Sequence, residues 1–480
     1  MLLALALVPA ATLFLVVTTS NPPGFYRDES AVAWNALLIA RSGDDEFGAS
    51  WPLFFQSFGD YKSPSYIYLL AGVFKVASPS ILAARFVSAA LGLLAVALLG
   101  LLAARVSGRA GVGAAVLLFA ALNPWLFEVS RLVFEVALFP LVLVAFLLVL
   151  RRAQERPRWS RPESVALGAL LGLMAYTYPT GRLLAPLLAL GLVAFSTCVR
   201  LRALAEAWAA FALALVPLAV FAARHPGSLS ARFYVTSYIT EESSPAGAAR
   251  RFVENYLANL NLWAWATEGD PNLRHHVPGT GSLLVATLLL ATAGAGLAAT
   301  RARREPWSRY LLWGLAVSLV PASLTFDRLH TLRMIPFPIF VLLMTVPALG
   351  WLWDGRGRWR RPALVLLLAG TVAQAGVFQL QFRDRGPDRG PPFAAAFPAV
   401  YARALAEPLR PVHVLLADHD YVQAYWYGAL WGVAPAELAA VAEGSSPPPE
   451  ALVVTSQEPC SGCRVLAQKE QFVAYVTPAR

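Results

Sequence analysis

Long apolar runs, separated by short charged clusters, dominate the first 380 residues of the chain. A helix needs about 20 mostly apolar residues to cross a bilayer, so we interpret eleven of these runs as transmembrane helices. A shorter run at 65–76 contains Lys75 and predicts a re-entrant or interfacial helix, or a twelfth span if it crosses. The expected fold class is therefore an all-α polytopic membrane protein with about 11 transmembrane helices, in a range of 11 to 13. The eleven runs cover residues 2–20, 80–104, 110–126, 134–150, 163–179, 183–199, 206–222, 281–300, 309–323, 334–353 and 362–380.

The placement of arginine predicts the orientation of these helices. Loops rich in positive charge stay in the cytoplasm, and arginine gathers in alternate loops here, whereas the intervening loops hold most of the carboxylates. We therefore expect a cytoplasmic N-terminus and an extracytoplasmic C-terminus. The first run has no basic segment before it and no small-residue cleavage site, so we interpret it as a span and not as a secretory signal. The 17 arginines that mark the cytoplasmic side are Arg105, Arg109, Arg151, Arg152, Arg156, Arg158, Arg161, Arg200, Arg202, Arg301, Arg303, Arg304, Arg309, Arg356, Arg358, Arg360 and Arg361.

Composition excludes several other classes of protein. Charged residues make up 14% of the chain, against about 25% in soluble domains. The net charge of +10 lies in separate clusters between apolar runs, which argues against a nucleic-acid-binding face. The motifs GxxxxGK(S/T) and strand-borne GxGxxG do not occur, so bound ATP or a dinucleotide is not expected. Three cysteines are too few for a disulfide framework, although Cys460 and Cys463 are expected to form a local disulfide.

The sequence pattern changes after residue 380. A Gly/Pro/Arg-rich linker at 381–395 precedes the β-like runs PVHVLL, ALVVTS and FVAYVT, which alternate with helix-like segments such as YVQAYWYGAL. This pattern predicts a small extracytoplasmic α/β domain over 396–480. The transmembrane domain would cover 1–380 and have two long outer loops, at 21–64 and 223–281.

The first outer loop contains a pair of carboxylates, Asp28 and Glu29, directly before a stretch that is typical of an amphipathic interfacial helix. Two interpretations stay open. Asp28 caps the helix while Glu29 favours its first turn through the helix dipole. Alternatively, a carboxylate at the membrane face beside a lipid-linked substrate serves as a general base.

Further along the outer side, Lys62 is one of only three lysines in the chain. A lysine at this boundary either holds a phosphate as a point charge or extends its ammonium to the headgroups. The segment NPWLFEVSRLVFEVALFP places Glu128, Arg131 and Glu135 at helical spacing, where the arginine could bridge two acids on one face. Three ionisable groups at this depth predict a polar cavity.

Cations recur at the same outer edge in three further segments. They are YTYPTGR with Arg182, GDPNLRHHVPGTG with Asp270, Arg274, His275 and His276, and FDRLHTLR with Asp327, Arg328, His330 and Arg333. As a set, these cations favour recognition of a phosphate or pyrophosphate headgroup. The histidine pair lacks spaced third and fourth ligands, so we predict no metal site from it.

Several of these segments occur in an order similar to that of a known class of enzymes. YRDE, DYKSPSYIYL, SRLVFE, YPTGR, GDPNLRHHVPGTG and DRLHTLRMIPFP follow one another along residues 1–380. On these motifs the chain resembles bacterial membrane glycosyltransferases of the GT-C class, family 39 type. That type includes the protein O-mannosyltransferases and the lipid A aminoarabinose transferases. The resemblance implies a GT-C fold and a sugar donor on a polyprenyl-phosphate carrier.

The resemblance also implies roles for individual residues. Asp28 would be the catalytic base that deprotonates an acceptor hydroxyl, with Glu29 beside it. Lys62 would contact the carrier phosphate, and Glu135 the acceptor or the sugar. The residues that would line the phosphate-binding wall are Arg131, Arg182, Arg274, His275, His330 and Arg333.

The chain departs from the family pattern in three places. The lipid A enzymes have an arginine shortly after the Asp-Glu pair, but Ser30, Ala31 and Val32 follow it here, so that phosphate contact must come from elsewhere or be absent. Ser63 separates the lysine from the proline that directly follows it in those enzymes. The WWDxG signature of oligosaccharyltransferases is missing, which disfavours transfer of a pre-assembled oligosaccharide by that route.

The expected function is that of an inverting membrane glycosyltransferase in the bacterial cytoplasmic membrane. It would transfer a hexosyl or pentosyl group from a polyprenyl-phosphate carrier to a hydroxyl of a lipid, polysaccharide or protein at the outer face. This mechanism requires no cofactor, although the carboxylates and histidines leave room for a divalent metal. The alternative is a polytopic transporter or lipid flippase. Transporters usually show paired halves and polar residues in mid-membrane, whereas the ionisable groups here gather at one face.

Overall fold

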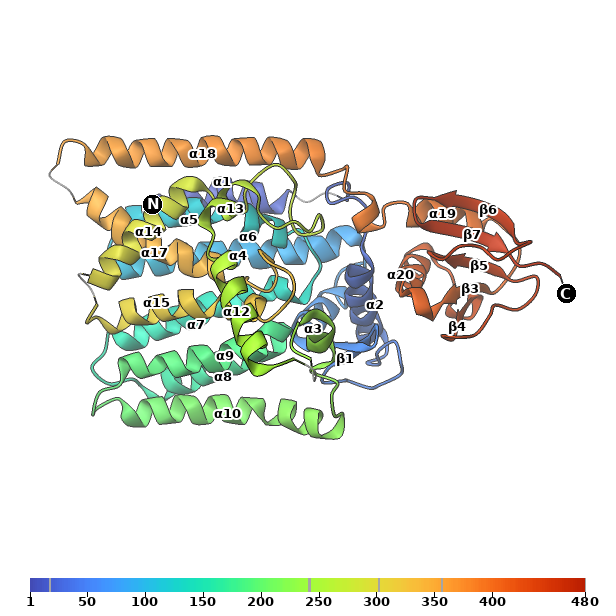
Figure 1. The fold of residues 1–480 in the computed structure, drawn as a ribbon, viewed down its shortest axis with the longest axis horizontal. Coiled ribbons are helices and arrows are strands. Elements are labelled where there is room, and N and C mark those ends of the chain that lie inside the picture. Colours follow the sequence, from blue (N-terminus) through green and yellow to red (C-terminus); the bar gives the residue numbers. More distant parts are fainter. Residues whose placement is uncertain (17–18, 241–242, 301–302, 355–356, 480) are drawn as a thin grey trace. The chain divides into compact units, whose positions relative to one another are not determined.

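The structure is a computed structural model that describes residues 1–16, 19–240, 243–300, 303–354 and 357–479 (Figure 1). Two of the predicted cytoplasmic arginines, Arg301 and Arg356, lie outside these described residues. The chain forms two compact units. The first comprises the N-terminal helix, Leu53–Tyr66 and Phe86–Phe382, and the second comprises the remaining segments. Each unit is made of several separate segments of the chain, so the units are defined by packing and not by continuous sequence. They therefore do not test the predicted domains at 1–380 and 396–480, which stay a prediction.

The first unit is helical, and each of the eleven predicted apolar runs contains a helix. Among the described residues, five helices are long and apolar enough to cross a membrane: α4, η1 with α7, α10, α17 and α18. The helices α1, α5, α14 and α9 with η2 are apolar but shorter, so the count of about eleven spans stays a prediction. The elements that lie wholly or mainly in this unit are α1 (Leu2–Leu15), β1 (Phe55–Ser57), β2 (Asp60–Lys62), α4 (Ile81–Ser107), α5 (Ala110–Ala121), α6 (Pro124–Val129), η1 (Glu135–Leu138), α7 (Phe139–Gln154), α8 (Arg161–Thr177), α9 (Pro179–Gly191), η2 (Leu192–Phe195), α10 (Leu201–Arg224), α11 (Ala231–Thr236), α12 (Pro245–Asn259), α13 (Leu262–Thr267), α14 (Val285–Thr300), α15 (Pro306–Val317), α16 (Val320–Ser323), α17 (Pro336–Trp353) and α18 (Arg360–Arg385).

The arginine-rich loops contact one another at one end of this helical unit, the left end in Figure 1. These contacts join the loops after α4, α7, α9, α14 and α17, which are the loops predicted to share a side. Assignment of this end to the cytoplasm rests on the positive-inside rule. The contacts are Arg105 with Glu155 at 2.6 Å, Arg109 with Asp354 at 2.5 Å, Arg200 with the carbonyl of Gln154 at 3.2 Å, and Arg309 with the carbonyl of Ala194 at 2.8 Å.

Small residues let two helix pairs in this unit approach closely. A Cβ atom built on Gly294 of α14 would lie 1.8 Å from the carbonyl oxygen of Met344 in α17. A Cβ atom on Gly168 of α8 would lie 2.3 Å from the carbonyl oxygen of Ala207 in α10. Such close backbone packing is a main source of helix association in lipid. Apolar side chains there are already surrounded by apolar lipid tails, so the hydrophobic effect contributes little to the association.

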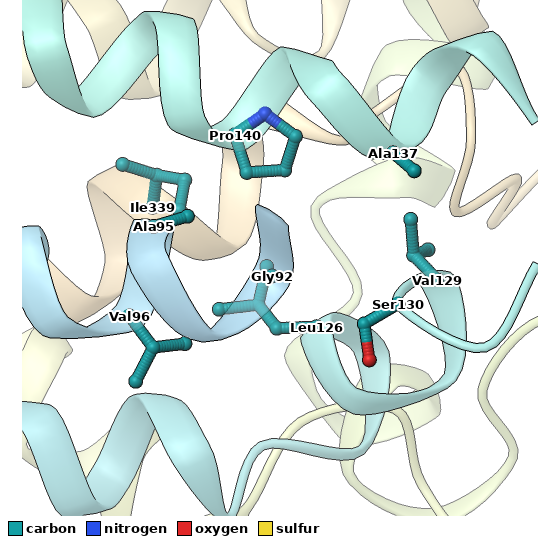
Figure 2. A pocket seen from close by; sticks show the side chains of 9 residues that line it. All are labelled: Gly92, Ala95, Val96, Leu126, Val129, Ser130, Ala137, Pro140 and Ile339. Atoms are coloured by element: carbon teal, nitrogen blue, oxygen red, sulfur yellow. The ribbon is translucent and has the colours of Figure 1, made fainter. Parts of the chain in front are cut away.

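The interior of the helical unit leaves little free space near α4, α6 and α7 (Figure 2). A cavity there measures about 10 Å³ and is lined by Ser130 and eight apolar or glycine residues. The Ser130 hydroxyl already donates to the carbonyl of Phe127 at 2.6 Å. The cavity is therefore about the size of one water molecule.

The second unit combines part of the first outer loop with the C-terminal segment. Helix α20 confirms the predicted helical segment YVQAYWYGAL, and it packs against α2 through Trp34 and Tyr425, whose ring centroids are 5.6 Å apart. The sheet has the order β4-β3-β5-β7-β6, with β3 parallel to β4 and β5 and the remaining pairs antiparallel. The elements are α2 (Arg27–Arg41), α3 (Pro64–Phe74), η3 (Pro391–Phe393), α19 (Phe397–Leu405), β3 (Val412–Leu415), η4 (Leu416–Asp418), α20 (Tyr421–Trp431), η5 (Pro435–Glu437), β4 (Leu438–Val441), β5 (Leu452–Thr455), β6 (Arg464–Lys469) and β7 (Phe472–Val476).

The three predicted β-like runs are confirmed as β3, β5 and β7, but β4 and β6 were not predicted. The strand β6 has the sequence RVLAQK, and all six of its residues are exposed or half-buried, so it lacks the apolar alternation that marks a strand. Cys460 and Cys463 form a disulfide, as expected.

The close approach at Gly294 generates a test of helix packing. Replacing Gly294 with Ala should lower the free energy of unfolding by about 1–3 kcal/mol, because the new methyl group overlaps a backbone carbonyl. Gly296→Ala is the matched control, since it lies on the same helix with nothing within 4 Å of the added Cβ. Circular dichroism of thermal unfolding in detergent should show a lower midpoint for the first variant only. Equal midpoints would contradict the packing.

Candidate functional site

The predicted site residues belong to both units. Asp28 and Glu29 lie in the second unit, and all the others lie in the first. We describe each group within its own unit. The others are Lys62, Arg131, Glu135, Arg182, Arg274, His275, His330 and Arg333.

Lys62 ends the short antiparallel hairpin formed by β1 and β2. Its ammonium lies 5.1 Å from the ring centroid of Phe58. The following residue, Ser63, donates its buried backbone N–H to Glu135 Oε1 at 2.5 Å. Glu135 thereby holds the segment that carries Lys62. Asp60, on the same hairpin, interacts electrostatically with Lys62, and burial raises its pKa above the ordinary value while the neighbouring cations act against this shift.

Arg182, in the first turn of α9, belongs to the same group of charged side chains as Lys62, Asp60 and Glu135. Its guanidinium lies 4.9 Å from the ring centroid of Phe54 and interacts electrostatically with Glu135 and Asp60. One nitrogen, Nη1, donates to the carbonyl of Leu229 at 3.1 Å. The other two, Nε and Nη2, are buried and have no hydrogen-bond partner among the described residues. These two nitrogens form the edge of guanidinium that binds carboxylate or phosphate through parallel hydrogen bonds.

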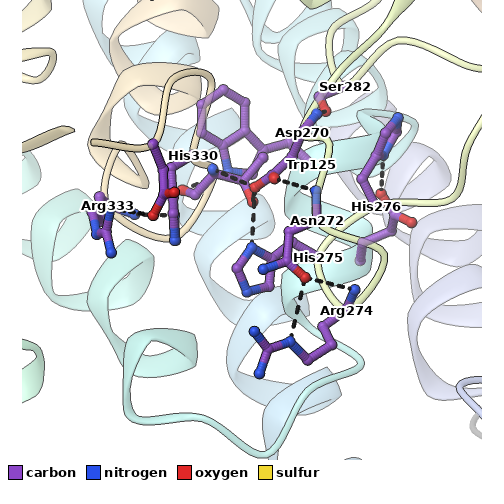
Figure 3. A network of polar contacts seen from close by, with 12 residues as sticks. Trp125, Asp270, Asn272, Arg274, His275, His276, Ser282, His330 and Arg333 are labelled. Carbon is purple, nitrogen blue, oxygen red and sulfur yellow. Dashed lines mark hydrogen bonds and ion pairs between the residues drawn. The ribbon is translucent and has the colours of Figure 1, made fainter. Parts of the chain in front are cut away.

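A second polar cluster forms around Asp270, in the loop after α13 (Figure 3). Asp270 Oδ2 accepts hydrogen bonds from the backbone N–H and the hydroxyl of Thr331, each at 2.7 Å, and lies 3.1 Å from His275 Nδ1. The ring of His330 lies 4.9 Å from that of His275. Donor atoms of Asp270, His275 and His330 all lie within 4.8 Å of one another, and all three side chains are buried.

Burial and neighbouring charges shift the pKa values of Asp270 and His330 in this cluster. Burial alone would raise the pKa of Asp270, but His275, His330 and the Thr331 hydroxyl lower it below its ordinary value. Burial, together with the charges of His275 and Arg333, lowers the pKa of His330 well below its ordinary value. At neutral pH the cluster therefore contains an ionised carboxylate and a neutral His330 imidazole.

Arg274 and Arg333 lie beside this cluster, but each has a protein partner. Arg274 Nε donates to the side-chain oxygen of Asn272 at 3.3 Å. Arg333 Nη1 lies 2.8 Å from Asp327 Oδ2 and donates to the hydroxyl of Thr325. Their assignment to a phosphate-binding wall stays a prediction.

The expected helical face of Glu128, Arg131 and Glu135 is wrong. Helix α6 ends at Val129 and the short helix η1 begins at Glu135, so the three residues do not share one helix. Arg131 instead donates to the carbonyls of Leu13, at 2.5 Å, and Val16, at 2.9 Å, at the C-terminal end of α1. These contacts give Arg131 a capping role.

Glu128 pairs with His276, which sequence spacing could not reveal. The distance from Glu128 Oε2 to His276 Nδ1 is 2.5 Å, and Glu128 Oε1 accepts the backbone N–H of Val277 at 2.8 Å. Burial alone would lower the pKa of His276, but Glu128 and the contact with the carbonyl of Thr280 raise it. This ion pair joins α6 to the loop that carries Asp270.

In the second unit, Glu29 caps a helix and forms a buried ion pair. Its carboxylate accepts the backbone N–H of Tyr26 at 3.0 Å, which caps α2, and lies 3.6 Å from Arg85. Both side chains of this ion pair are fully buried. Arg85 also donates to the carbonyls of Pro22 and Gly24 at 2.7 Å each. Asp28 follows the cap in the first turn of α2 and is half-buried, so it is not the capping residue. Its role as base stays a prediction.

Two further carboxylates of the second unit, Asp418 and Asp420, were not predicted. They follow the carboxyl end of β3, where Asp418 accepts hydrogen bonds from Thr455 and from the backbone N–H of Ser456. Burial raises the pKa of Asp420 to about 6, Asp418 adds to this shift, and Ser456 and Arg27 oppose it. The signal in the sequence is the DHD triplet directly after a β-like run.

Comparison with known proteins addresses the fold. In a sequence search, no curated protein matches this chain. The family model described as "Dolichyl-phosphate-mannose-protein mannosyltransferase" matches residues 61–224. The crystal structure of ArnT from Cupriavidus metallidurans bound to undecaprenyl phosphate superposes with a TM-score of 0.60 at 15% identity, over 98% of this chain and 97% of that chain. Its apo state gives a TM-score of 0.59 at 16% identity, over the same shares.

The chain has the GT-C fold. The family model and these neighbours confirm the predicted resemblance to GT-C glycosyltransferases of the family 39 type. They do not favour the alternative of a transporter or flippase.

The buried ion pair of Glu29 and Arg85 generates a prediction for stability. Arg85→Met should lower the free energy of unfolding by about 3–5 kcal/mol, because it leaves the Glu29 carboxylate buried without its cation. Arg105→Met on the same helix is the control, since its ion pair with Glu155 is partly exposed and should cost at most about 1 kcal/mol. Thermal unfolding in detergent measures both. A loss no greater for Arg85→Met than for Arg105→Met would count against this role.

The raised pKa of Asp420 generates a pH dependence. The folded-state pKa of about 6 exceeds the ordinary value of 3.8, so folding favours the protonated form. This contribution to stability is fully present below about pH 4 and is lost as the pH rises through about 6. Thermal midpoints between pH 4 and pH 7 should fall more steeply for the wild type than for Asp420→Asn. The exposed Asp384→Asn should retain the wild-type slope, and an unchanged slope in Asp420→Asn would refute the assignment.

Proposed function

We propose that this chain is an integral membrane glycosyltransferase of the bacterial cytoplasmic membrane. It transfers one sugar from a polyprenyl-phosphate carrier to a hydroxyl group of a lipid, glycan or protein at the outer face. The observation that carries this proposal is the buried Nε/Nη2 edge of Arg182, which has no partner among the described residues and belongs to the group that contains Lys62. An oxyanion is the ligand that such a guanidinium edge matches.

The location of Arg182 supports a lipid-linked donor. The arginine-rich loops meet at one end of the helical unit. Helix α9 runs toward that end, so Arg182 in its first turn lies at the opposite end, which the positive-inside rule assigns to the outer face. A carrier with its tail in the bilayer can present a phosphate at this depth. The ArnT neighbour was solved bound to undecaprenyl phosphate, which supports a carrier of that class.

The proposed reaction is a single displacement. Asp28 takes the proton from the acceptor hydroxyl, whose oxygen forms a bond to the anomeric carbon. The bond from that carbon to the phosphate oxygen breaks, so the configuration inverts and the carrier phosphate leaves with the electron pair. Lys62 and Arg182 stabilise the charge on the leaving phosphate. Glu135 positions the Lys62 segment through the backbone N–H of Ser63, and Glu29 caps the helix that carries Asp28.

An assay with radiolabelled polyprenyl-phosphate sugars, offered as a panel of hexoses and pentoses with envelope acceptors, tests this proposal. Asp28→Asn should lower kcat by about 10²–10⁴-fold, because the acceptor loses its base. Arg182→Lys should lower kcat/KM by about 10²–10³-fold, because it keeps the charge but loses the bidentate edge.

Arg250→Gln is the matched control, since this arginine is exposed and pairs with Glu254 on its own helix. It should leave both rate constants unchanged. Full turnover by Asp28→Asn would remove the proposed base. Movement of a lipid or solute across proteoliposomes without any covalent product would show that the chain is a transporter instead.

A further inference from the structure

We propose that Asp270, His275 and His330 bind one zinc ion. The three side chains come from two loops, one after α13 and one before α17, and all are buried. Their donor atoms lie within 4.8 Å of one another. The proposal stands apart from the proposed function, because its test does not use transfer activity.

The chemistry of the donors selects the class of metal. Two imidazoles and one carboxylate suit Zn²⁺, which takes nitrogen and oxygen ligands in four-coordinate sites. Mg²⁺ and Ca²⁺ prefer sites made of oxygen alone. Three protein ligands leave the fourth position for water or for an oxygen of a bound molecule.

The distances require little adjustment to accept the ion. Zinc ligands lie about 2.0–2.1 Å from the metal, so two ligands in a tetrahedral site are about 3.3 Å apart. Asp270 Oδ2 and His275 Nδ1 are already 3.1 Å apart. The other donor distances, all within 4.8 Å, exceed this ligand spacing by at most about 1.5 Å.

A shell of hydrogen bonds holds the carboxylate in place, as is typical for metal ligands. Thr331 donates twice to Asp270 Oδ2, and Asn272 donates its backbone N–H to Oδ1 at 2.8 Å. Trp125 fastens both loops to α6, since its ring N–H donates to the carbonyl of Thr331 at 3.0 Å and its backbone N–H to the carbonyl of Ser282 at 3.2 Å (Figure 3). The site is thus pre-organised, and a bound zinc ion would link the loop after α13 to the loop before α17.

The nearby arginine has a carboxylate partner of its own. Arg333, three residues after His330, is paired with Asp327 at 2.8 Å. The Asp270 carboxylate supplies the negative charge that a divalent ion needs.

Metal content of the purified full-length protein in detergent tests the proposal. The protein is stripped with a chelator, incubated with Zn²⁺ and dialysed, and its zinc is measured by inductively coupled plasma mass spectrometry. We expect about one zinc per chain in the wild type and less than a tenth of that in His275→Ala and His330→Ala. His413→Gln, on β3 of the other unit, is the control and should retain the wild-type content.

Two further measurements keep the result interpretable if a variant is unstable. Zn²⁺, but not Mg²⁺, should raise the thermal midpoint of the wild type by at least about 2 °C and leave that of His330→Ala unchanged. Co²⁺ in place of zinc should give visible absorption typical of a four-coordinate site. Zinc content that is equal in the triad variants and in His413→Gln, or a wild type that retains no zinc and shows no thermal shift, would overturn the proposal.

Discussion

An ionisable side chain can stay buried at the ends of these helices only where a partner compensates its charge. Moving an isolated charge out of water costs several kcal/mol or more, and this constraint shapes the end of the helical unit that lies opposite the arginine-rich loops. Glu128 is matched by His276, and the Asp270 carboxylate accepts two hydrogen bonds from Thr331. In the second unit the same constraint pairs Glu29 with Arg85.

Arg182 stands out against this pattern. Two of its buried nitrogens have no hydrogen-bond partner among the described residues, although two carboxylates act on it electrostatically. A native structure rarely keeps a buried donor unsatisfied without a reason such as a ligand or water. In the proposed function, a phosphate oxyanion would satisfy both nitrogens and offset the charge of Lys62.

The division between helices and loops explains how the GT-C fold persists at 15% identity to ArnT. The helices depend on apolar composition and on small residues such as Gly294 and Gly168, and many sequences meet these requirements. The connecting segments differ in character, because the β1–β2 hairpin, the loop around Asp270 and the loop around His330 hold buried polar groups.

The local sequence pattern was sufficient to predict helices and strands, because these elements depend mainly on residues that are close together in the chain. Apolar runs predicted a helix in every one of the eleven positions, and β-like alternation predicted β3, β5 and β7. Lys62 and Arg182 were selected because they are cations at a predicted membrane boundary, and their roles stay a prediction. The helical face of Glu128, Arg131 and Glu135 failed because a break after Val129 interrupts the periodicity.

The sequence by itself determined the class of the protein, since low charge and long apolar runs leave a membrane as the only suitable solvent. It also indicated which loop segments hold the charged and histidine side chains. Only the tertiary structure decided the partners: Arg85 for Glu29, His276 for Glu128, and His330 beside Asp270 and His275. The partners in the first two pairs are 56 and 148 residues apart in the chain. Packing, which no local pattern records, brings such residues together.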